Sequence, residues 1–66
     1  MTIKQYIEKY PNESNDMIYY RIVCDRDDGN LFGVAFYGEK GTQKQRRKLN
    51  YIWKTILKHR QHLENE

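Results

Sequence analysis

The chain has 66 residues, with 12 Lys and Arg against 9 Asp and Glu and a net charge of +3. This length limits it to one small domain, residues 1–66, and no apolar run approaches the ~20 residues that a membrane span requires. Cys24 is the only cysteine, which excludes an internal disulfide; with no secretory signal in the sequence, it favours a cytoplasmic location. A core this small rarely supplies more than about 3–5 kcal/mol on its own, so we expect a homodimer.

Charge is divided unevenly along the chain. Residues 1–39 carry four basic and seven acidic side chains, a net charge of −3. Residues 40–66 carry eight basic and two acidic ones, a net charge of +6. Such asymmetry is typical of a protein with one end that meets an anion, although an acidic half and a basic half can also meet within a dimer.

The first predicted element is a short helix that begins after Thr2. Thr2 can cap it, and Ile3, Tyr6, Ile7 and Tyr10 follow at helical spacing. Pro11 ends it, because the residue before a proline is disfavoured in the α region. Residues 11–16 then form a polar loop.

Residues 17–25 and 30–37 are rich in β-branched and aromatic residues and are separated by a turn signal, so they predict a β-hairpin. A three-residue loop, Asp27-Asp28-Gly29, sets the register, with Gly29 in the left-handed conformation; a two-residue Asp28-Gly29 turn is the alternative. One face is then uniformly apolar and comprises Ile18, Tyr20, Ile22, Cys24, Phe32, Val34 and Phe36. The opposite face pairs Tyr19 with Tyr37 and Arg21 with Ala35.

The last predicted element is a long amphipathic helix over residues 42–63. Thr42 and Gln45 predict a capping box at its start. The apolar positions cluster within about one third of the helix circumference and predict a core-facing stripe: Leu49, Ile52, Trp53, Ile56 and Leu63, with Leu57 at the edge. The predicted fold is therefore α+β, with an N-terminal helix, a two-stranded antiparallel hairpin and a C-terminal helix packed on the hairpin.

This layout resembles that of the arm-site DNA-binding domains of phage and transposon integrases, in which a hairpin precedes a basic helix. The resemblance rests on the order of the elements and on residues 19–23 with Asp28-Gly29, and it covers about two thirds of the chain. No specific motif residue accompanies it.

The polar face of the C-terminal helix is the main candidate site. Cations spaced about one turn apart can follow a phosphate backbone, and an aromatic side chain among them can stack on a base. Several of these cations lie in the first two turns, where the helix dipole disfavours positive charge, which suggests that they are used. The candidate nucleic-acid-binding residues are Lys44, Arg46, Arg47, Lys48, Tyr51, Lys54 and Lys58. An acidic protein partner and a merely solvated face are the alternatives.

Other features predict less chemistry. Tyr19, Arg21 and Tyr37 form a candidate interaction or dimer face on the hairpin. His59 and His62 are one turn apart, but no second ligand pair completes a metal site. Cys24 is expected to be a buried apolar residue. No nucleophile–base set is present, so we predict a protein that is not an enzyme and needs no cofactor.

These observations predict a small regulatory protein that binds DNA or RNA. The alternative is a compact phage-type inhibitor or adaptor that docks on a host protein through the basic helix or by strand addition at the hairpin edge.

Overall fold

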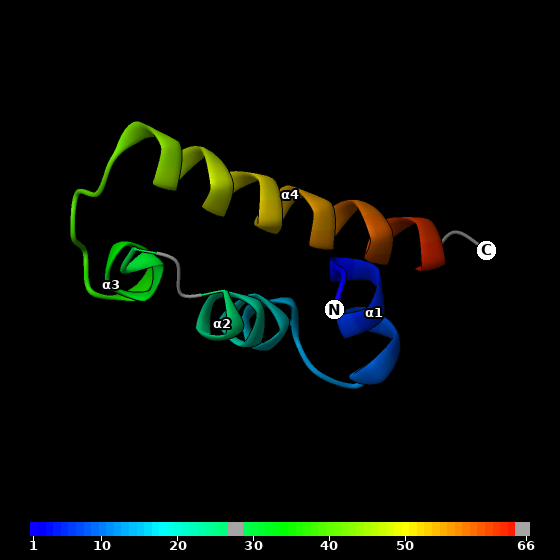
Figure 1. The fold of residues 1–66 in the computed structure, drawn as a ribbon. Helices are drawn as coiled ribbons and strands as arrows, with labels where there is room; N and C mark the ends of the chain where they lie inside the picture. Colours follow the sequence, from blue (N-terminus) through cyan, green and yellow to red (C-terminus); the bar gives the residue numbers. More distant parts are fainter. Residues whose placement is uncertain (27–28, 65–66) are drawn as a thin grey trace.

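The computed structural model describes residues 1–26 and 29–64, without the side chains of residues 62–64. The described chain is all-α and contains no strand. Its helices are α1 (Ile3–Lys9), α2 (Asn15–Asp25), α3 (Leu31–Phe36) and α4 (Gln43–Glu64). Helix α4 runs the length of the molecule and contacts each of the other three, with α3 beside its first half and α1 beside its second (Figure 1).

The predicted β-hairpin is wrong, and with it the α+β fold and the integrase-like layout. Its first strand is helix α2, and most of its second strand is helix α3. Ile18 and Ile22 are fully buried, whereas Tyr20 and Cys24 are exposed. A strand would place all four side chains on one face, while a helix separates them as observed. The β-propensity of this segment is overridden by its tertiary packing.

Side-chain caps set the starts of α1, α2 and α4, and two of these caps follow the sequence prediction. Thr2 and Gln5 form a capping box at α1, and Thr42 and Gln45 form one at α4. The Thr42 amide donates to Gln45 Oε1 at 2.8 Å, and the Gln45 amide donates to Thr42 Oγ1 at 3.1 Å. The third start was missed: the Ser14 hydroxyl accepts from the Met17 amide at 3.3 Å and opens α2.

The core lies between α4 and the other helices. Its main cluster joins residues of α1, α2 and α4, and a second, smaller cluster joins α2, α3 and α4. The predicted stripe of α4 is largely confirmed, because Leu49, Ile52 and Ile56 are buried, Trp53 is half-buried and Leu57 is at the exposed edge. The side chain of Leu63 lies outside the described residues.

The segment between α2 and α3 keeps one feature of the predicted turn. Gly29 adopts φ +66°, the left-handed conformation expected of it, and Asn30 follows with φ 70°. They turn the chain from one helix into the next instead of between two strands. The carbonyl of Gly29 accepts a hydrogen bond from the Gln45 side chain, so this turn is fixed to the start of α4. Asp27 and Asp28 lie outside the described residues.

Candidate nucleic-acid interface

The exposed face of α4 is a strip of positive charge. Residues 43–63 contain seven Lys and Arg and no Asp or Glu. Lys44, Arg47, Lys54 and Lys58 are exposed on the side of α4 opposite the core stripe, and none of them forms an ion pair with a described residue. From Lys44 to Lys58 the strip spans roughly 21 Å at 1.5 Å per residue. We call these four residues the basic strip. Tyr51 lies within it and is 63% exposed.

Two predicted members of this site have another environment. Arg46 lies outside the basic strip. Its Nη1 donates to the carbonyls of Lys40 and Gly41 at 3.0 and 3.1 Å. It therefore stabilises the connection into the helix. Lys48 is half-buried and has an interaction within the protein. The structure thus brings together the other predicted residues and sets these two apart.

A groove on one side of the basic strip adds cations that the sequence prediction missed. It has a volume of about 400 Å³, and its lining includes Lys4, Arg26, Tyr51 and His59. Arg26 Nη2 also donates to the Met1 carbonyl at 3.2 Å, which holds the N-terminus beside this groove. Lys4 and Arg26 are far from α4 in sequence, so only the packing of α1 and α2 against α4 reveals that they extend its positive surface.

The predicted face of Tyr19, Arg21 and Tyr37 is not assembled. Arg21 is drawn to the segment between α1 and α2, where its Nε and Nη2 donate to the two carboxylate oxygens of Glu13, both at 2.6 Å. Its guanidinium also lies 4.0 Å from the centre of the Tyr10 ring. The hydrogen bonds from Arg21 lower the pKa of the Glu13 carboxyl, despite the smaller opposing effect of its desolvation. Arg21 is therefore a structural residue.

Tyr19 and Tyr37 instead belong to an aromatic series that the hairpin prediction concealed. Tyr19 packs edge-to-face against Trp53 of α4 and Phe36 of α3, with ring centres 5.5 and 5.6 Å apart. The Phe36 ring also contacts the rings of Tyr20 and Phe32, and the Phe32 ring contacts that of Tyr37. Tyr37 is 74% exposed, and Tyr20 and Phe36 are about 40% exposed. The outer part of this series is an apolar surface on α2 and α3.

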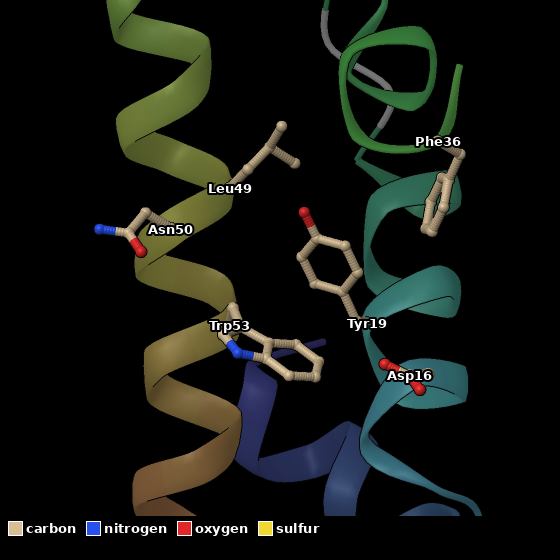
Figure 2. Close-up of a pocket in the computed structure, with 6 residues that line it drawn as sticks. All are labelled: Asp16, Tyr19, Phe36, Leu49, Asn50 and Trp53. Carbon is tan, nitrogen blue, oxygen red and sulfur yellow. The ribbon is translucent and has the colours of Figure 1, made fainter. Parts of the chain in front are cut away.

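The inner part of the series lines a groove between α2 and α4, which we call the aromatic groove (Figure 2). Its volume is about 470 Å³, within the range of ligand sites. The rings of Tyr19 and Trp53 project into the space between the two helices, and Asp16 lies at one end. Burial raises the pKa of the Tyr19 hydroxyl above its ordinary value. The lining residues are Asp16, Tyr19, Phe36, Leu49, Asn50 and Trp53.

The remaining sequence predictions concern Cys24, metals and membranes. Cys24 is exposed, and its predicted burial was wrong because it followed from the hairpin face. Among the described residues, no group of three His, Cys, Asp or Glu is placed to hold a metal ion, and the side chain of His62 lies outside them. None of the described helices combines the length and apolar character needed to cross a bilayer.

The described residues thus form a small protein of four helices with one basic helix face and an adjoining aromatic groove. No protein-family description, curated protein or solved structure matches the chain.

Proposed function

We propose that this protein binds nucleic acid through the basic strip of α4. The observation that carries the proposal is the concentration of exposed cations on one helix face without an acidic side chain between residues 43 and 63. Like charges at this spacing repel one another, and those near the start of the helix also oppose its dipole. A polyanion that binds along the strip removes both costs.

The chemistry of the strip fits phosphate contacts better than base reading. Lysine and arginine at successive turns contact phosphates, release counterions and add little sequence discrimination. Lys4 and Arg26 beside the neighbouring groove extend the positive surface toward α1. We therefore expect binding that is strong at low salt and weakly specific.

The test is a matched pair of charge reversals. K54E/K58E reverses two cations of the basic strip, and K9E/K40E reverses two exposed lysines elsewhere. Both variants have the same composition and the same net charge of −1 instead of +3. Because each lost phosphate contact lowers the slope of log K against log salt concentration by roughly 0.9, K54E/K58E should reduce that slope by about 2. The control should keep the slope nearly unchanged.

Fluorescence anisotropy with labelled DNA and RNA at several salt concentrations measures these slopes, and circular dichroism confirms that both variants are helical. Equal weakening in the two variants would show that net charge, and not the strip, governs binding. Failure of the wild-type protein to bind DNA or RNA at low salt would refute the proposal.

A second candidate is an inhibitor or adaptor that docks on a protein, and the exposed aromatic surface of α2 and α3 favours it. Strand addition is no longer a route, because the described residues contain no strand. The homodimer that the small core predicts stays a prediction, and this apolar surface is where a second copy would pack. Under this hypothesis Y37S, which changes a residue 74% exposed, should abolish stoichiometric capture of one host protein and leave nucleic-acid binding unchanged.

A further inference from the structure

We propose that the aromatic groove accommodates a base of a single-stranded nucleic acid whose phosphates lie on the basic strip. This inference rests on the proposed function and makes it more specific: it names single strands as the preferred ligand and the groove as the place where a base is bound.

The position of the groove relative to the cations is the first argument. Asn50 lines the groove from α4, and Arg47 and Lys54 lie three residues before and four residues after it. Residues at this spacing are neighbours on a helix surface. The rim of the groove is therefore also the edge of the basic strip, and a nucleotide with its phosphate beside Arg47 or Lys54 has its base directed toward the groove.

The walls of the groove are the second argument. Trp53 and Tyr19 meet edge-to-face at an interplanar angle of 83°, and Phe36 contacts Tyr19 at 65°. Tyr19 and Trp53 are each only half-buried, so part of each ring is open to the groove. Stacking on such rings is tolerant of sequence because every base has a π-face. Two of the three aromatic residues, Tyr19 and Trp53, project into the space between α2 and α4 in Figure 2.

Asp16 gives the groove a chemical preference. Its carboxylate is exposed in the first turn of α2 and lines the groove at the end farther from Leu49 (Figure 2). An ionised carboxylate only accepts hydrogen bonds, so it favours bases with an exocyclic amino group, such as cytosine N4. It also repels phosphate, which keeps the backbone at the opposite rim, beside Arg47 and Lys54. We therefore expect cytosine to be preferred to thymine or uracil.

A duplex does not offer this contact, because its bases are stacked and paired. Inserting one would require flipping it out at a cost of several kcal/mol. A single strand presents its bases without that cost. The groove therefore distinguishes the two ligands, whereas the basic strip alone does not.

Trp53 is the only tryptophan, so its fluorescence reports directly on the groove. The experiment titrates the wild-type protein with oligo(dC), oligo(dT) and duplex DNA, and follows both anisotropy of labelled DNA and Trp53 emission. We expect oligo(dC) to quench Trp53 and protect it from acrylamide, and to bind about tenfold more tightly than oligo(dT). Duplex DNA should bind without either change in Trp53.

The matched variants are D16N and E8Q, each of which removes one exposed carboxylate. D16N should reduce the preference for oligo(dC) over oligo(dT) several-fold and leave duplex binding nearly unchanged, and E8Q should keep the wild-type preference. Binding to single strands without a change in Trp53 emission or accessibility would overturn the groove assignment and leave the basic strip in place. Absence of binding to every nucleic acid would instead overturn the proposed function itself.

Discussion

The Tyr6–Asp25 hydrogen bond allows a quantitative test of how α1 is held on α2. The Tyr6 side chain is only 4% exposed, and its hydroxyl donates to Asp25 Oδ2 at the end of α2. Y6F keeps the buried ring and removes only this hydrogen bond. A hydrogen bond to a charged group contributes roughly 1.5–3 kcal/mol. Since Asp25 is exposed and can be rehydrated in the variant, we expect a loss of about 1 kcal/mol at pH 7.

The same hydrogen bond predicts an alkaline dependence of stability. Burial, followed by the hydrogen bond and charge of Asp25, raises the pKa of Tyr6 to about 12 from 10.0. A raised pKa means that the folded state holds the proton more tightly than the unfolded state. The contribution of the protonated Tyr6 hydroxyl to the free energy of unfolding is therefore complete below pH 10. It is lost as pH rises toward 12, at up to about 1 kcal/mol per pH unit.

Urea unfolding of wild type and Y6F, followed by Trp53 fluorescence at several pH values, measures both effects. The difference between the two proteins cancels the titration of the other tyrosines and the lysines. Wild type should be more stable at pH 7, and the difference should vanish or change sign between pH 11 and 12. A difference that stays constant from pH 8 to pH 12 would show that the hydrogen bond does not couple to folding.

Five further substitutions test the helix packing and the connections. I52A empties a fully buried position and should cost about 2–5 kcal/mol, enough to unfold much of the population, whereas I52V should cost about 1 kcal/mol, as measured by urea midpoints. T42A removes the capping box of α4 and should cost about 1 kcal/mol in the same assay. G38A and G41A both place alanine at positive φ, but only at Gly41 does the new Cβ meet Val34, at 2.6 Å. G38A should therefore cost about 1 kcal/mol and G41A distinctly more, and equal costs would contradict the contact.

The terminal helices could be predicted from the sequence because their signals are local and agree with one another. Thr2 and Thr42 each precede a glutamine by three residues, and apolar residues follow each cap at helical spacing. The capping residues, the helical spacing of the apolar residues and the segment boundaries all indicate a helix in these segments. The basic strip could be predicted for the same reason, because the positions of the cations around α4 follow from the helix period alone.

The middle of the chain was ambiguous in a specific way. Ile18 and Ile22 are four residues apart, which satisfies both an alternating strand and an amphipathic helix. The β-branched and aromatic composition favoured the strand, and the outcome depended on Tyr20 and Cys24, whose exposure the sequence does not reveal. One signal for the helix is present in the sequence: Ser14 followed by Asp16 in the first turn is a helix start, although the polar composition of residues 11–16 predicts a loop.

That one misassignment also hid the aromatic groove. In a hairpin, Tyr19 and Trp53 have no reason to meet, because Tyr19 lies on the strand face opposite the one that α4 would cover. In helix α2, Tyr19 is one residue from the buried Ile18 and turns toward α4, where it meets Trp53. The basic strip needs only α4, whereas the groove needs α2, α3 and α4 in their helical arrangement. A variant that disrupts α2 but leaves α4 helical should therefore retain electrostatic binding and lose any preference between single strands and duplexes.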